Sequence, residues 1–85
     1  MPLYKITISK LAQKQLDKLA DNLASKLVDA IYILAKDPRP GGCKKLKGRE
    51  GYRIRVGDYR IIYQIFDDVL VINVMALGHR KDIYN

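Results

Sequence analysis

A segment rich in proline and glycine, residues 37–42 (DPRPGG), divides this chain into two parts that need different secondary structure. Proline lacks an amide hydrogen and crowds the preceding turn, so a helix cannot continue through this segment. Before it, apolar residues recur at the three- and four-residue spacing of amphipathic helices. After Gly51, apolar and polar residues alternate as they do in strands. This division favours helices packed on a sheet, the α+β class.

The first part is predicted to form one strand and two helices. Apolar and polar residues alternate over residues 3–8, which indicates a short, half-buried strand. Ser9 stands where the N-cap of a helix is expected, and Asp21 or Asn22 can cap a second helix that runs to the proline segment. Two helices joined by so few residues are expected to form a hairpin with a shared apolar side.

The second part is predicted to form three strands, over residues 52–56, 59–65 and 69–77. Gly57-Asp58 suits a two-residue hairpin turn, and Asp67-Asp68 marks the next reversal. The expected order is therefore β-α-α-β-β-β. We expect a single domain over residues 1–85, with the helical hairpin packed on a mostly antiparallel four-stranded sheet.

Several classes of protein are excluded by simple features of the sequence. The chain has 85 residues and one cysteine, so a secreted scaffold held by disulfides is excluded. No apolar signal stretch begins the chain, and its longest apolar run, residues 69–77, is far shorter than the ~20 residues that span a bilayer. A cytoplasmic protein without a membrane partner is expected.

Basic residues are concentrated in one quarter of the chain. The net charge is +7, and the stretch from Arg39 to Arg60 holds eight of the basic residues and only two acidic ones. The rest of the chain is nearly neutral. A local basic patch of this kind predicts a polyanionic partner, either nucleic acid or an acidic protein.

Three arginines of this patch are expected to share one face of the sheet. If Gly57-Asp58 closes a two-residue hairpin, Arg55 pairs with Arg60, and Arg53 lies on the same face because alternate residues of a strand do. Such a face either is solvated and protects the sheet from aggregation, or binds phosphate through guanidinium groups. Four further basic residues would line its rim: Lys44, Lys45, Lys47 and Arg49.

The C-terminal residues offer groups for proton transfer. His79, Arg80 and Tyr84 together supply an imidazole, a permanent cation and a phenol, which suit acid–base chemistry on a phosphate ester. The single histidine cannot form a metal site with Cys43 at a plausible spacing, so neither a metal nor a cofactor is predicted.

Three segments resemble toxins of the RelE/ParE superfamily: residues 51–56 (GYRIRV), 57–63 (GDYRIIY) and 78–84 (GHRKDIY). The resemblance covers nearly the whole chain. It implies the RelE-like microbial ribonuclease fold and a type II toxin, which forms a hetero-oligomer with a cognate RelB-like antitoxin. RelE-like members cleave mRNA in the ribosomal A site. ParE-like members share the fold but act on DNA gyrase and lack the nuclease residues.

The RelE-like branch implies roles for individual residues. By resemblance, the catalytic positions fall on Arg53, Arg55, Arg60, Arg80 and Tyr84, and some ribosome-dependent relatives use a C-terminal histidine, here His79. The best-known member has lysines at the positions of Arg53 and Arg55. Compared with that member, this chain has two residues fewer between Arg80 and Tyr84.

The implied reaction needs no metal. The RNA 2′-hydroxyl attacks the adjacent phosphate and leaves a 2′,3′-cyclic phosphate and a free 5′-hydroxyl. The arginines would stabilise the transition state, with Tyr84 as base and Arg80 or His79 as acid. Two alternatives remain, a gyrase poison on the same fold and a basic module that binds RNA or DNA without cleaving it.

Overall fold

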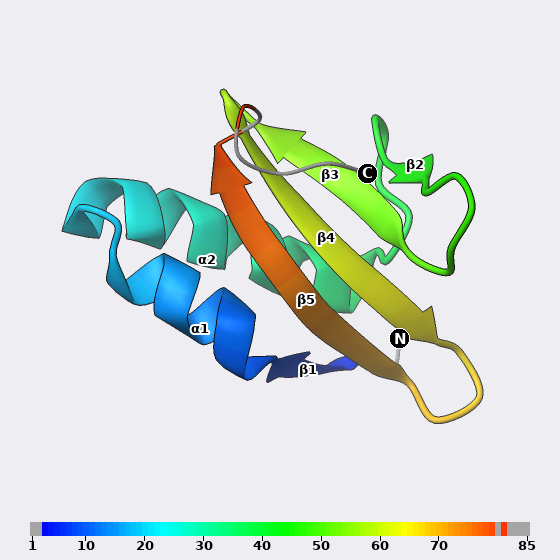
Figure 1. The fold of residues 1–85 in the computed structure, drawn as a ribbon. Helices are drawn as coiled ribbons and strands as arrows, with labels where there is room; N and C mark the ends of the chain where they lie inside the picture. The colour runs from blue at the N-terminus through cyan, green and yellow to red at the C-terminus, as the bar shows by residue number, and fades with distance from the viewer. Residues whose placement is uncertain (1–2, 80, 82–85) are drawn as a thin grey trace.

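The computed structural model describes residues 3–79 and 81, which form two helices on one face of a five-stranded sheet (Figure 1). In chain order the elements are β1 (Lys5–Ile8), α1 (Lys10–Asp17), α2 (Asp21–Lys36), β2 (Lys44–Lys45), β3 (Tyr52–Val56), β4 (Tyr59–Phe66) and β5 (Val71–His79). In this described part of the chain, neither helix is long and apolar enough to cross a bilayer.

The sheet has the strand order β1-β5-β4-β3-β2. β1 runs parallel to β5, and every other neighbouring pair is antiparallel. The predicted α+β class and the helical hairpin on a mostly antiparallel sheet are confirmed. The sheet has one strand more than the four expected, because the two residues of β2 pair with the start of β3.

The last strand lies two residues later than its apolar run suggests. It was expected over residues 69–77, but β5 covers Val71–His79. Val69 and Leu70 belong to the turn instead. Val69 is 63% exposed, and Leu70 adopts a left-handed backbone conformation with φ of 55°. As a result, His79 is the last residue of the strand rather than the residue after it.

The core lies between the helices and the sheet face that they cover. α2 buries three side chains of its apolar stripe, Leu27, Ile31 and Leu34, and α1 contributes Ala12. The sheet meets them with six buried residues, Ile54, Ile61, Tyr63, Ile72, Val74 and Leu77. The opposite side of the sheet, which the helices do not cover, is called the far face below.

A β-bulge interrupts the pairing of β4 with β5. Tyr63 lies opposite Val74, but the preceding residue, Ile62, lies opposite Ala76, so Met75 is the extra residue. An extra residue reverses the alternation of side chains beyond it. Val74 and Leu77 can therefore both face the helices although they are three positions apart.

α1 covers the edge of β5 where β1 ends. The Ser9 hydroxyl donates to the Met75 carbonyl at 2.7 Å and accepts from the Ala12 amide at 3.1 Å, which makes Ser9 the N-cap of α1 as predicted. Further along, the Leu77 amide donates to Gln15 Oε1 at 2.8 Å. The backbone of β5 thus keeps its hydrogen bonds beyond the short parallel pairing.

We expect Ser9→Ala to lower the free energy of unfolding by about 1–2 kcal/mol, because it removes a helix cap and a bond to the bulge together. Urea unfolding followed by circular dichroism measures the change. Ser25→Ala is the matched control, since Ser25 is exposed within α2 and should change stability by less than about 0.5 kcal/mol. Equal effects of the two substitutions would contradict this role for Ser9.

Candidate nucleic-acid interface

The hairpin of β3 and β4 has the predicted register. Arg55 lies opposite Arg60, and Arg53 lies opposite Ile62. Gly57 opens the two-residue turn with a φ of 60°, as the first residue of a type II′ turn requires. Since Ile54 and Ile61 lie in the core, Arg53, Arg55 and Arg60 all belong to the far face. We call these three residues the arginine row. Arg55 is exposed, and the other two are half-buried.

The four rim residues are exposed but do not form one group. Lys44 pairs with Arg53 and so shares the face of the arginine row, whereas Lys45 pairs with Tyr52 on the other face. Lys47 and Arg49 lie in the loop between β2 and β3. The structure therefore brings Lys44 to the arginine row and separates Lys45 from it.

The loop with Lys47 and Arg49 is fixed on the far face by a small apolar cluster. Leu46 is 5% exposed and packs with Ile62, which is 1% exposed, beside Met75 and Ala76. Its amide donates to the Gly51 carbonyl at 2.9 Å, which closes the loop. Because Ile62 lies directly opposite Arg53, this anchor holds the basic loop next to the arginine row.

His79 lies on the opposite face from the arginine row. It pairs with Tyr59, which packs against the core, and the two rings meet edge to face with their centres 5.5 Å apart. The Lys81 amide donates to His79 Nδ1 at 3.2 Å, a bond that requires this nitrogen to be unprotonated. The bulge at Met75 causes this placement, because it reverses the alternation of the last residues of β5. Arg80 and Tyr84 lie outside the described residues.

Tyr63 is unsuited to act as a base. Its hydroxyl donates to the Pro38 carbonyl at 2.8 Å, and burial of the ring raises its pKa well above the usual range. Within residues 3–79 and 81, no group of three or more His, Cys, Asp or Glu side chains is placed to hold a metal ion.

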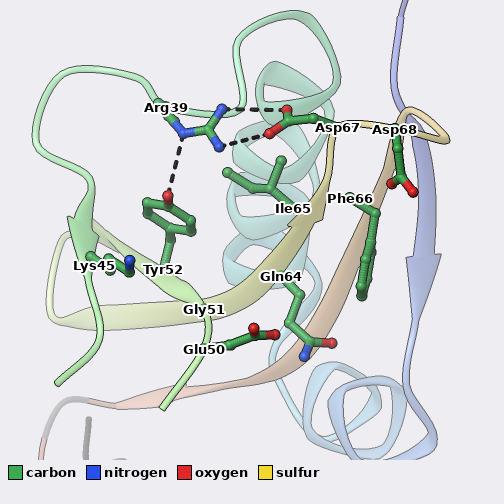
Figure 2. A pocket seen from close by; sticks show the side chains of 10 residues that line it. All are labelled: Arg39, Lys45, Glu50, Gly51, Tyr52, Gln64, Ile65, Phe66, Asp67 and Asp68. Carbon is green, nitrogen blue, oxygen red and sulfur yellow. Dashed lines mark hydrogen bonds and ion pairs between the residues drawn. The ribbon is translucent and has the colours of Figure 1, made fainter. Parts of the chain in front are cut away.

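A polar network that the sequence did not indicate joins four segments at one end of the sheet, and Figure 2 shows three of its members, Arg39, Tyr52 and Asp67. Arg39 forms a salt bridge with Asp67 at 3.0 Å and lies over the ring of Tyr52, 5.2 Å from its centre. Tyr4 donates its hydroxyl to Asp67 Oδ1 at 2.6 Å. The network connects the residue before β1, the α2–β2 loop, β3 and the β4–β5 turn. Its members are too far apart in the sequence for any local pattern to pair them.

The stability of the fold should decrease in the acid range as Asp67 becomes protonated. Hydrogen bonds from Arg39, and then from Tyr4, hold the pKa of Asp67 below its ordinary value near 3.8. A carboxylate with a lowered pKa stabilises the fold above its unfolded pKa, and this contribution is lost as the pH falls through the folded pKa. We therefore expect Asp67→Asn to be less stable than the wild type near pH 7, and the difference to shrink as the pH falls through the lowered pKa of Asp67.

Thermal unfolding of both proteins between pH 2 and pH 8 measures this difference. Asp68→Asn is the control, because Asp68 is the neighbouring exposed carboxylate and the salt bridge joins Arg39 to Asp67. If the difference between wild type and Asp67→Asn were constant over this range, the salt bridge would not contribute to stability.

A family model described as the ParE toxin of type II toxin–antitoxin systems matches residues 6–84. Toxin RelG of Mycobacterium tuberculosis is 28% identical over 83 residues, which cover 95% of each chain.

Two solved structures have closely similar folds. A chain of the RelE–RelB complex from Pyrococcus horikoshii shares 30% identity with a TM-score of 0.82, over 95% of this chain and 99% of that one. A chain of the RelBE2 toxin–antitoxin complex from Mycobacterium tuberculosis shares 26% identity with a TM-score of 0.83, over 94% of both chains. Because the family model matches nearly the whole length of the chain, the chain belongs to the ParE toxin family of type II toxin–antitoxin systems.

Proposed function

We propose that this RelE-like toxin is a metal-independent endoribonuclease that cleaves mRNA on the ribosome and thereby inhibits translation. The observation that carries the proposal is the arginine row, with Arg55 placed directly opposite Arg60. Like charges in that position cost some tenths of a kcal/mol or more, which favours a function for the pair over a structural role. A phosphate between the two guanidinium groups relieves this repulsion.

The arginine row suits the transition state of the proposed reaction. When the 2′-hydroxyl attacks the adjacent phosphate, negative charge increases on the phosphate oxygens, and fixed cations stabilise this charge more than that of the ground state. Guanidinium groups stay protonated at any working pH and bind phosphate oxygens in pairs. Lys44, on the same face, adds a further cation beside Arg53.

We assign the proton transfers to the C-terminal segment. In this proposal Tyr84 is the base, as the resemblance implies. A phenol with an ordinary pKa of ~10 needs cations beside it to ionise near pH 7. Arg80 stabilises the leaving oxygen as a hydrogen-bond donor, because a guanidinium with a pKa above ~12 does not readily release its proton. His79 is the weaker candidate for the acid, since its side chain lies on the face away from the arginine row.

We further propose a RelB-like antitoxin as the partner, in the cytoplasm. Two of the most similar solved chains come from complexes with an antitoxin. A basic face that binds RNA phosphates also attracts an acidic protein segment, so the antitoxin can inhibit the toxin by covering this face.

The test is inducible expression of the chain without its antitoxin, followed by primer extension on a chosen mRNA. We expect growth to stop and cuts to occur inside codons of the translated mRNA. A copy of the same mRNA without its start codon should stay intact, because it does not enter the ribosomal A site. Growth arrest with both mRNAs intact would contradict the proposed cleavage.

A second function, poisoning of DNA gyrase, is favoured by one observation, the ParE name of the matching family. It predicts that the purified protein inhibits supercoiling of plasmid DNA by gyrase and leaves translation in a purified system unchanged. Our proposal predicts the reverse result in both assays.

A further inference from the structure

A cavity of about 420 Å³ lies at the end of the sheet where β4 extends past β3 (Figure 2). Its walls come from residues just before and at the start of β3, the last residues of β4, the β4–β5 turn and Arg39. A volume of this size suits part of a small organic molecule or a single nucleotide. None of the three residues of the arginine row is among the described residues that line it.

One wall of the cavity carries charges that compensate each other. Arg39 donates from both terminal nitrogens to the Asp67 carboxylate, at 3.4 and 3.0 Å, and covers one face of the Tyr52 ring. Tyr63 stacks near Tyr52, with ring centres 6.1 Å apart. Because the charge of Arg39 is compensated by Asp67, this arginine is not available to bind a phosphate.

The remaining charges make the cavity slightly acidic. Lys45 supplies one cation, whereas Glu50 and Asp68 supply two carboxylates. Glu50 is one of only two acidic residues between Arg39 and Arg60, so the cavity is an exception within the basic part of the chain. A phosphate is disfavoured there, and a neutral group with N–H donors is favoured.

An aromatic ring and an amide complete the site. Phe66 is 39% exposed, and its ring lines the cavity. Gln64 accepts from Asn73 Nδ2 at 3.3 Å through its amide oxygen, and its NH₂ group is a hydrogen-bond donor. Glu50 lines the same cavity as Gln64, and both side chains are labelled in Figure 2.

We propose that this cavity binds one nucleobase of the substrate RNA and prefers guanine, which extends the proposed function above. The ring of Phe66 stacks on the base, as aromatic side chains do with unstacked RNA bases. The Glu50 carboxylate accepts from the two adjacent N–H donors of guanine, at N1 and N2, while Gln64 or Lys45 donates to O6. Adenine and cytosine place a ring nitrogen acceptor beside their single amino group, which repels a carboxylate.

The cavity and the arginine row are connected along one strand. Gln64 lines the cavity and lies on the far face, two residues along β4 from Ile62, which pairs with Arg53. Two residues of strand span about 7 Å, at ~3.3 Å per residue. One RNA chain can therefore place a base in the cavity and a neighbouring phosphate on the arginine row.

The test measures binding of four-nucleotide RNAs that carry 2′-O-methyl groups and so cannot be cleaved by 2′-hydroxyl attack. The probes are UUGU, UUAU and UUIU, where I is inosine, which lacks the N2 amino group. We expect wild type to bind UUGU about tenfold more tightly than UUIU by isothermal titration calorimetry. Glu50→Gln should reduce this ratio to about one. Asp58→Asn removes the other acidic charge of the basic stretch, outside the cavity, and should keep the ratio.

Two further measurements make the result decisive. Phe66→Ala should weaken binding of all three RNAs alike, because stacking depends little on the base. Thermal unfolding checks that each variant is folded. Equal affinities of wild type for UUGU and UUIU would overturn the base site but not the proposed function, since binding through the arginine row would still weaken with salt.

Two other outcomes would separate a failure of the base site from a failure of the proposed function. If Glu50→Gln left the ratio unchanged but weakened binding of a RelB-like antitoxin, the cavity would be a protein contact, and the inference would be wrong. If wild type bound none of the RNAs and cut no translated mRNA in cells, the proposed function itself would fail.

Discussion

Replacement of Arg55 or Arg60 by alanine is expected to lower the rate of ribosome-dependent mRNA cleavage about 10²- to 10³-fold. Removal of one preorganised group that stabilises developing negative charge has an effect of this size. The two residues face each other across β3 and β4, so each substitution removes one of two cations that would hold the same phosphate. The loss should appear mainly in the rate of the chemical step.

The free energy of unfolding should stay the same or rise slightly for Arg55→Ala, although its activity falls. This side chain is exposed and lies directly opposite another cation, so its removal relieves repulsion of about 0.2–1 kcal/mol. A variant that is as stable as the wild type, or slightly more stable, and yet inactive separates catalysis from folding. Arg55→Lys keeps the charge but loses the paired geometry of the guanidinium, so its activity should be intermediate.

The measurement is cleavage of a short mRNA programmed into the A site of purified ribosomes, with enzyme in excess. Lys26→Ala is the matched control, because Lys26 is an exposed cation on α2, on the helical side of the sheet. It should retain nearly full activity. Similar losses in Lys26→Ala and Arg55→Ala would mean that only the overall charge matters, and the arginine row would then not be the catalytic site.

Gly51→Ala is expected to lower the free energy of unfolding by about 2–4 kcal/mol. Gly51 has a φ of 129°, in a region that residues with a side chain rarely adopt. An added Cβ would also lie 3.1 Å from Leu46 Cδ1 and 3.2 Å from both Met75 Cε and the Tyr63 carbonyl oxygen. Backbone strain and overpacking therefore act together. For a domain of this size, the loss is a large part of a total stability of roughly 5–13 kcal/mol.

Two other glycines separate these causes. Gly48 has a φ of 74° but nothing within 4 Å of an added Cβ, so Gly48→Ala should show the backbone strain alone, about 1–2 kcal/mol. Gly41 has neither constraint, and Gly41→Ala should leave stability nearly unchanged or slightly raised. Chemical unfolding of the three variants tests the order. A Gly51 variant no less stable than the Gly48 variant would show that the contacts with Leu46 and Met75 do not limit the site.

The arginine row could be predicted from the sequence because its determinants are local. A two-residue turn at Gly57-Asp58 sets the register of β3 and β4, and the alternation of side chains then assigns Arg53, Arg55 and Arg60 to one face. The Ser9 cap and the end of α2 before Pro38 depend on equally local signals.

The features that escaped prediction depend on distant contacts. The bulge at Met75 forms where β4 meets β5 and has no mark in the sequence, yet it decides that His79 faces the helices. The bond between Arg39 and Asp67 joins two loops 28 residues apart. The base-binding cavity depends on both loops, so it could not be anticipated from either one.

The parallel pairing of β1 with β5 has a consequence for how the protein is made. Residues of these strands pair across a separation of 66 positions, so the first strand to leave the ribosome is among the last to find its neighbour. The three strands that carry or flank the arginine row, β3 to β5, also lie in the last part of the chain. A nascent chain therefore lacks the sheet for most of its synthesis. The arginine row can form only after most of the chain has been made.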